Sequence, residues 1–302
     1  MIPRQSLPES VLALAARQDG VLATRQLLRA GVTPEVLARL GSQWQRPAQG
    51  LYLLGPATWG AAANAGLLRG GPTAVLGEHA AAHLHGAVRD APRVLTVWAR
   101  ERRDGFRVGD WEVIYRRGLR SGVGTPSRTR LEESLLDLAR HSSENETVAA
   151  TARALAGRRT TPERVVAALA ERTRCRHSST LRALCEHANH GIESALEWRF
   201  HTQVLLPHGL PIPERQVSTV AGRVDGLYRD YGLIVELDGV RDHADWAKDM
   251  WRDNTHVVEG LATLRYGWTA VEDTRCDVAA QLGAALGKRT WDGTPTHCRR
   301  CR

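Results

Sequence analysis

The chain has 302 residues and a formal net charge of +8, with 41 Lys plus Arg against 33 Asp plus Glu. This length is enough for two or three domains. No run of eighteen apolar residues and no apolar signal-peptide core is present, so neither a membrane-spanning helix nor a secretory leader is expected. Five cysteines, an odd number in a long chain, do not form a disulfide framework. These features predict a cytoplasmic protein that does not contact a membrane.

The charge is unevenly placed along the chain. Residues 1–58 carry +3, residues 59–190 carry +7 and residues 191–302 carry −2. A basic front part and an acidic rear part predict polyanion binding joined to a carboxylate site. An arginine bias of the genome would also explain the basic composition, because every basic residue except Lys248 and Lys288 is arginine.

Residues 1–58 predict a small helical unit with a wing. Helices are expected over residues 8–17, 25–30 and 34–41, with Thr24 and Thr33 as N-caps of the second and third. Two short capped helices with a glycine between them have the spacing of a helix-turn-helix. The segment that follows the third helix reads as a hairpin-like wing.

In such a unit the third helix enters the major groove of DNA. The expected DNA-binding side chains are polar residues of the second helix, the third helix and the wing, namely Arg25, Glu35, Arg39, Gln43, Gln45 and Arg46. A helical bundle cap that touches no nucleic acid is the alternative.

Residues 59–190 predict a mixed α/β domain without a catalytic signature of its own. Helices are expected over residues 74–84, 129–139, 148–156 and 161–172, and strands over 93–98 and 111–116. His79 and His83 are four residues apart, but no third metal ligand accompanies them. Polar helix positions or hydrogen-bonded core histidines are therefore expected, together with His85.

Residues 191–292 have the predicted order α-β-β-β-α-β. A helix over 192–205 precedes a strand over 214–220, a hairpin, a helix over 245–259, a strand over 261–266 and a last helix over 278–286. The hairpin carries Asp225 on its first strand and Glu236 and Asp238 on its second, joined by the turn at residues 229–232.

The hairpin brings Asp225 beside Glu236 or Asp238 at its open end, where hard divalent cations find carboxylate oxygens. The expected metal ligands are Asp225, Glu236, Asp238 and the carbonyl of Leu237, and Glu197 from the first helix adds a further oxygen. Arg252 or Arg265 would meet the charge that develops on a phosphate. The expected cofactor is Mg²⁺ or Mn²⁺.

This arrangement resembles the PD-(D/E)XK nuclease superfamily, and more narrowly its very-short-patch-repair (Vsr)-like branch. The resemblance rests on segments 194–197, 224–225, 235–239, 252–254 and 264–268 and on His243. It implies a restriction-endonuclease-like core, a mixed sheet flanked by helices. The metal aspartate of the family falls on Asp225 and its (D/E) position on Glu236. His243 falls where the repair branch carries a catalytic histidine, and Asp238 stands where the superfamily has lysine.

The front of the chain resembles AbiEi-type antitoxins of type IV toxin–antitoxin systems. The winged N-terminal domain of the family matches segments 24–27, 31–32 and 49–53, and its second domain is similar to segments 78–81 and 84–86. The resemblance implies DNA binding with repression of the protein's own operon. It also implies a partner toxin; a homo-oligomer is the other expected partnership.

Together these features predict an α/β multidomain protein, with domains over residues 1–58, 59–190 and 191–292 and a tail over 293–302. The expected function is DNA binding joined to metal-dependent hydrolysis of DNA phosphodiesters. The alternative is an AbiEi-like autorepressor whose nuclease-like core is inactive and serves protein contacts.

The tail contains Cys298 and Cys301 at zinc-ligand spacing, and Cys276 or His297 would complete a site. A single C-x-x-C is a weak signal. Zinc is therefore not expected there, and the tail is predicted to be a loop that is dispensable for nuclease function.

Overall fold

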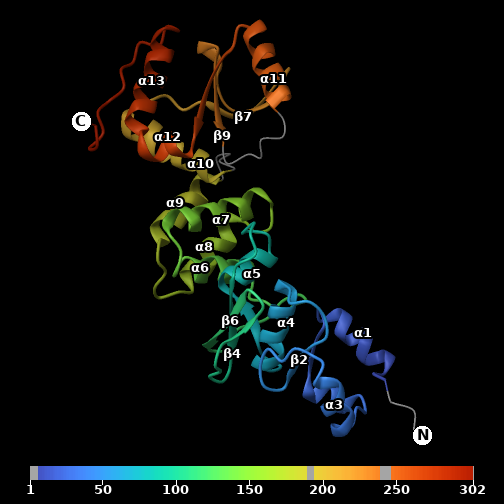
Figure 1. Ribbon diagram of the computed structural model, residues 1–302. Helices are drawn as coiled ribbons and strands as arrows, with labels where there is room; N and C mark the ends of the chain where they lie inside the picture. The colour runs from blue at the N-terminus through green and yellow to red at the C-terminus, as the bar shows by residue number, and fades with distance from the viewer. Residues whose placement is uncertain (1–5, 189–193, 239–245, 302) are drawn as a thin grey trace. The chain divides into compact units, whose positions relative to one another are not determined.

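The computed structural model describes residues 6–188, 194–238 and 246–301, with only the backbone of residues 246–249. Helices and strands form an α/β multidomain protein, as predicted (Figure 1). The chain divides into two compact units, Met1–Ser178 and Ser179–Arg302. This division falls inside the predicted domain 59–190. Among the described residues, no helix combines the length and apolar character needed to cross a membrane.

The first part of unit 1 is helical with a narrow two-stranded sheet. It consists of α1 (Glu9–Arg17), β1 (Val21–Ala23), α2 (Thr24–Arg29), α3 (Pro34–Gly41) and β2 (Leu51–Leu53). β1 and β2 are antiparallel, and Gln45 also bridges to Leu53. The three helices lie close to their predicted bounds. β1 was not predicted, and β2 pairs with it, whereas within the wing segment the structure has only the bridge between Gln45 and Leu53.

The N-cap of α3 is Thr33, whose hydroxyl accepts a hydrogen bond from the Val36 N–H at 3.4 Å. The expectation for α2 was wrong, because its N-cap is Ala23 and Thr24 is already its first residue. The Thr24 hydroxyl instead donates to the Gly50 carbonyl at 3.3 Å and ties the helix to the wing.

A second sheet follows in unit 1, with the strand order β3-β4-β6-β5. It consists of β3 (Val75–Gly77), β4 (Val94–Ala99), β5 (Phe106–Val108) and β6 (Trp111–Arg117), and β4 and β6 are parallel. The predicted helix over residues 74–84 is wrong in its first part, where β3 pairs with β4. Only α5 (Glu78–Leu84) is helical, because Glu78 has a positive φ of 50° that separates the strand from the helix.

The helix α4 (Trp59–Gly70), which was not predicted, packs against both sheets of unit 1. Its alanines share one core with Val21, Leu53 and Val97. Gly66 permits the close approach, because a Cβ there would lie 2.9 Å from the Val97 side chain. Residues 1–58 are therefore not a separate packing unit.

The remaining helices of unit 1 are α6 (Leu131–Leu138), α7 (Glu144–Ala156) and α8 (Pro162–Ala170), close to the predicted bounds. The three histidines near α5 are hydrogen-bonded, as expected. His79 pairs with Ser142 at 2.9 Å, and His83 and His85 meet backbone carbonyls at 3.2 and 2.8 Å.

Unit 2 places helices on both faces of one mixed sheet (Figure 1). Its helical elements are α9 (Ser178–Ala188), α10 (Ala195–Arg199), the π-helical segment η1 (Phe200–Leu205), η2 (Leu206–His208), α11 (Trp246–Val258), α12 (Trp268–Asp273) and α13 (Arg275–Gly287). The strands are β7 (Glu214–Thr219), β8 (Gly222–Tyr228), β9 (Leu233–Asp238) and β10 (Ala262–Gly267), in the order β10-β9-β8-β7.

The sheet of unit 2 has three antiparallel strands and one parallel pair, β9 and β10. Phe200, Val204 and Leu282 pack with Val235 on one face, while Val224 and Ile234 lie in a separate cluster. The short helix η3 (Arg229–Tyr231) and Gly232, in the left-handed conformation with φ 56°, close the β8–β9 hairpin at the predicted turn. The element order after residue 194 is the predicted one except for the short helix α12, which was not predicted.

Candidate functional site

Asp225 and Glu236 lie at the open end of the β8–β9 hairpin. The register pairs Gly226 with Val235, so the next residues outward are Asp225 and Glu236. One Asp225 oxygen, Oδ2, accepts a hydrogen bond from the Leu237 N–H at 2.8 Å. The hairpin therefore brings the predicted carboxylates to neighbouring strand ends and fixes the orientation of Asp225.

The Glu236 carboxylate is buried, with 2% of the residue exposed. Arg252 of α11 contacts it, with Nη2 2.6 Å from Oε1. The pKa of Glu236 is raised to about 7, chiefly by burial; Arg252 and Arg265 act to lower it, and the negative charges of Asp225 and Asp238 act to raise it. A carboxyl group that titrates near neutrality, beside two other acids, is typical of a functional site.

Asp238 ends β9 and is paired with Arg265 of β10. Arg265 Nη1 lies 3.1 Å from Asp238 Oδ2, and Nη2 lies 3.1 Å from Asp253 Oδ1. Both predicted phosphate-binding arginines, Arg252 and Arg265, thus reach the site, and each is already paired with a carboxylate. Asp253, which orients Arg265, was not among the predicted site residues.

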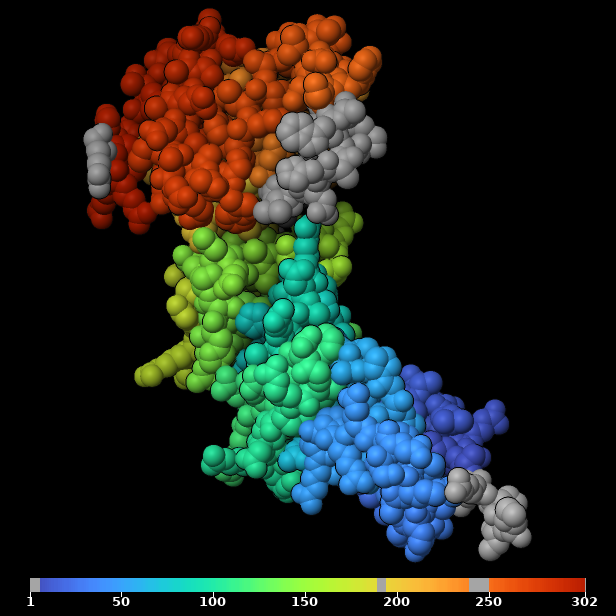
Figure 2. All heavy atoms as spheres, in the orientation of Figure 1, coloured from blue at the N-terminus to red at the C-terminus, as the bar shows by residue number. Residues whose placement is uncertain are grey.

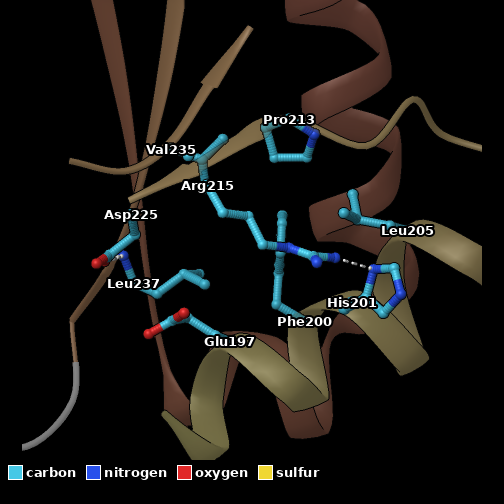
Figure 3. Close-up of a pocket in the computed structure, with 10 residues that line it drawn as sticks. Glu197, Phe200, His201, Leu205, Pro213, Arg215, Asp225, Val235 and Leu237 are labelled. Carbon is cyan, nitrogen blue, oxygen red and sulfur yellow. Dashed lines mark hydrogen bonds between the residues drawn. The ribbon is translucent and has the colours of Figure 1, made fainter. Parts of the chain in front are cut away.

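Glu197 approaches the same strand ends from α10. Its backbone N–H donates to the Ser194 hydroxyl at 3.0 Å, which caps the helix at that point. Figure 3 shows the Glu197 and Asp225 carboxylates at one end of a small pocket, with Leu237 between them. Arg215 crosses this pocket and meets His201 Nδ1 at 3.0 Å. The pocket therefore joins a helix acid to the hairpin acid, as predicted for Glu197.

Gln216 is a site residue that the sequence did not reveal. Its Nε2 donates to Glu197 Oε2 at 3.1 Å, and its Oε1 accepts from Arg223 Nε at 2.6 Å. The β7–β8 register pairs Arg215 with Gly226 and Val217 with Val224 and skips Gln216, which has a positive φ of 53°. Such strain in a non-glycine residue persists only where the surroundings enforce it, and it is concentrated at functional sites.

The carboxylates at the hairpin end are near one another without forming a closed ligand set. Among the residues that the structure describes, Asp225, Glu236 and Asp238 do not gather three oxygens within 4.8 Å of one another. His243, predicted to move a proton, lies outside the described residues.

A different set of side chains, in the described part of unit 2, could hold a metal ion. His208, Cys276, Cys298 and Cys301 place one ligand atom each within 4.8 Å of one another. Residues 293–301 form a loop, as predicted, and this loop folds back onto η2 and α13, which the sequence did not predict. The Thr296 N–H donates to the His208 carbonyl at 2.8 Å.

The predicted DNA-binding residues of unit 1 lie on α2, α3 and the segment before β2. Arg25, Glu35, Gln43, Gln45 and Arg46 are exposed, and Arg39 is half-buried. The Arg25 side chain donates to the Leu68 carbonyl of α4 at 2.9 Å, and the Arg46 guanidinium lies over the Tyr52 ring at 5.3 Å. Hydrogen bonding to its backbone and to Thr33 lowers the pKa of Glu35.

No family model matches the chain, and no curated protein matches it in sequence.

Proposed function

We propose that unit 2 is a divalent-metal-dependent nuclease that hydrolyses DNA phosphodiesters and that unit 1 binds DNA. The observation that carries the proposal is the buried Glu236 carboxyl between Asp225 and Asp238. Three acids at adjoining strand ends repel one another, and the pKa of Glu236, raised to about 7, reflects burial together with this repulsion. A bound cation would relieve the repulsion, so these residues suit Mg²⁺ or Mn²⁺.

In this proposal Asp225 and Glu236 hold the cation, and the Leu237 carbonyl, Asp238 and Glu197 offer further oxygens. A bound Mg²⁺ lowers the pKa of a coordinated water and draws charge from the phosphate oxygens. The hydrogen bond from the Leu237 N–H fixes the Asp225 carboxylate at 2.8 Å, and Gln216 fixes Glu197 at 3.1 Å.

The two arginines supply positive charge for the phosphate. Arg265 is oriented by Asp238 and Asp253, each at 3.1 Å. Arg252 bonds Glu236 and also donates to the Arg223 carbonyl. With a cation held by these carboxylates, the Arg252 guanidinium would offer positive charge to the phosphate in the transition state. Asp238, in place of lysine, orients the attacking water, and His243 keeps the proton-moving role that the resemblance implies.

One observation favours the second candidate, an AbiEi-like autorepressor with an inactive core. Arg252 pairs with Glu236 at 2.6 Å, and Arg265 pairs with Asp238 at 3.1 Å, so side chains of the protein already compensate both acids. Such internal pairing would suit a core retained for contacts with a partner toxin or with a second copy of the chain.

A nicking assay on supercoiled plasmid, with purified full-length protein and Mg²⁺ or Mn²⁺, tests the proposal. We expect nicking by the wild type and none by Asp225→Asn or Glu236→Gln. Asp230→Asn is the matched control, because Asp230 is exposed in η3 at the closed end of the same hairpin.

A gel-shift assay on the same preparations separates the two candidates. DNA binding with no nicking by the wild type under any metal condition would reject the nuclease and retain the repressor. Unchanged nicking by either site variant would show that the carboxylates are wrongly assigned.

A further inference from the structure

Unit 2 contains a cluster of three cysteines and one histidine that the proposed nuclease site does not use. His208 ends η2, Cys276 is the second residue of α13, and Cys298 and Cys301 lie in the tail. The tail lies at the surface of unit 2, beside α13 in Figure 1 and visible at the edge of the unit in Figure 2. Three segments that are distant in sequence therefore converge at one point.

Three of the six distances between the ligand atoms match a tetrahedral metal site, and all six are within 4.8 Å. Cys276 Sγ lies 3.6 Å from Cys298 Sγ, Cys298 Sγ lies 3.7 Å from Cys301 Sγ, and Cys301 Sγ lies 3.5 Å from His208 Nε2. With Zn–S bonds of about 2.3 Å and a Zn–N bond of about 2.0 Å, a regular tetrahedron separates two sulfurs by about 3.8 Å and a sulfur from the nitrogen by about 3.5 Å. A disulfide needs about 2.05 Å between its sulfurs, so no pair here is bonded.

His208 is oriented as a metal ligand would be. The residue is buried, with 2% exposed, and its Nδ1 lies 2.8 Å from the Val204 carbonyl. This carbonyl can only accept, so Nδ1 carries the proton and the lone pair of Nε2 points at the cysteines. A hydrogen bond from the second ring nitrogen fixes the tautomer of metal-bound histidines in the same way.

The backbone around the tail cysteines is also arranged for thiolates. The Cys298 N–H donates to Cys301 Sγ at 3.3 Å, and the Arg300 N–H donates to Cys298 Sγ at 3.3 Å. The Cys301 N–H closes a turn onto the Cys298 carbonyl at 3.1 Å. The short C-x-x-C segment thus presents both sulfurs to the same point.

Packing holds the tail in place without a long apolar interface. A Cβ at Gly283 of α13 would lie 2.2 Å from Pro295, so only glycine permits this approach. The residues from 292 to 300 are mostly exposed, including Thr296 and His297. So little buried surface offsets little of the conformational entropy that these nine residues lose when they keep one conformation, and a cross-link would reduce that loss.

We propose that His208, Cys276, Cys298 and Cys301 form a structural zinc site that fastens the tail to α13 and η2. Four protein ligands close the coordination sphere, which is the pattern of structural rather than catalytic zinc. Three thiolates and one imidazole favour zinc over Mg²⁺ or Mn²⁺, which prefer oxygen. On binding, the thiols release their protons to solvent and the sulfurs bond to the metal, without oxidation. The inference stands whether or not the carboxylate site cleaves DNA.

Metal analysis of the full-length protein, purified under reducing conditions and desalted, tests the inference. We expect one zinc ion per chain in the wild type and loss of that zinc in Cys276→Ser, Cys298→Ser and His208→Ala. Cys175→Ser is the matched control, because Cys175 lies in unit 1, outside the cluster. Replacement by Co²⁺ should give the strong visible absorption of a tetrahedral cobalt–thiolate centre.

If the substituted variants fail to fold, chelation of the wild-type protein tests the same proposal. A zinc-selective chelator should lower the melting temperature of the wild type and leave a protein lacking residues 294–302 unchanged. Zinc-free wild type that binds no Co²⁺ when reduced would overturn the proposal. Zinc retained by both Cys276→Ser and Cys298→Ser, or an oxidised cysteine pair in metal-free protein, would do the same.

Discussion

Glu236 is expected to make the stability of unit 2 fall as the pH rises in buffer without Mg²⁺ or Mn²⁺. Its pKa is raised from 4.5 to about 7, chiefly by burial. A carboxyl group that holds its proton more tightly in the folded state stabilises that state when protonated. The stabilisation is fully present below pH 4.5 and is lost as the pH rises through about 7.

The size of this effect follows from the difference between the two pKa values. A difference from 4.5 to about 7 corresponds to about 3 kcal/mol at most. Glu236→Gln cannot ionise, so its free energy of unfolding should lack this pH dependence. The amide also leaves the Arg252 guanidinium without its anion, which lowers stability by an amount that changes little with pH.

Urea unfolding of the full-length wild type and Glu236→Gln, between about pH 4.5 and 8, measures the difference. The transition of unit 1 should be identical in both proteins and serves as an internal reference. At pH 8, added Mg²⁺ should stabilise the wild type by about 2.7 kcal/mol at one hundred times its Kd. The variant should gain much less.

If the free energies of unfolding of the two proteins changed with pH in parallel, the raised pKa of Glu236 would be refuted. An opposite trend, with the wild type gaining stability relative to the variant as the pH rises, would show that the Arg252 ion pair outweighs burial. A wild type that Mg²⁺ does not stabilise at pH 8 would refute the assignment of the cation.

Three further outcomes are expected. Ser194→Ala removes the N-cap hydroxyl of the helix that carries Glu197, so the free energy of unfolding of unit 2, measured in urea, should fall by about 1 kcal/mol. Ser194→Asp should keep the wild-type stability, and an alanine variant as stable as the wild type would contradict the capping role. Arg39→Ala and Arg46→Ala in a fragment of residues 1–178 should each lower the log–log salt slope of DNA affinity by about one, measured by fluorescence anisotropy; a salt-independent affinity would reject the phosphate contacts. A fragment of residues 1–58 should melt less cooperatively than residues 1–178 in calorimetry, because its sheet shares a core with α4; equal cooperativity would show that the shared core is not needed.

Strong local signals explain which parts of the fold the sequence predicts. The β-branched run before Glu236 and the turn with Gly232 specify the hairpin, and the periodicity of α6 to α8 specifies those helices. The helix α4 escapes prediction because its alanines and glycines carry no polar–apolar period. β3 escapes because its three residues run directly into a helix.

In the candidate site, too, contacts within one hairpin are predictable from the sequence, whereas contacts between distant segments are not. Carboxylates at adjoining strand ends follow from the hairpin alone. The partners of these carboxylates do not follow from it. Arg252 reaches Glu236 from α11, and Gln216, which bonds Glu197, has a left-handed backbone conformation that the sequence does not indicate. The metal cluster is the extreme case, since His208 and Cys301 are separated by 93 positions and a single C-x-x-C does not identify its distant partners.

The π-helical segment η1 fixes the direction in which the Glu197 side chain points relative to the His208 side chain. One continuous helical stretch carries Glu197 near its start and His208 at its end, and η1 lies between them. Each residue of an α-helix advances the direction of its side chain by about 100°. Deleting one residue within η1, such as Thr202, would therefore turn Glu197 away from Asp225 if His208 kept its place. The length of this stretch is constrained at both ends at once, so it should tolerate substitutions far better than insertions or deletions.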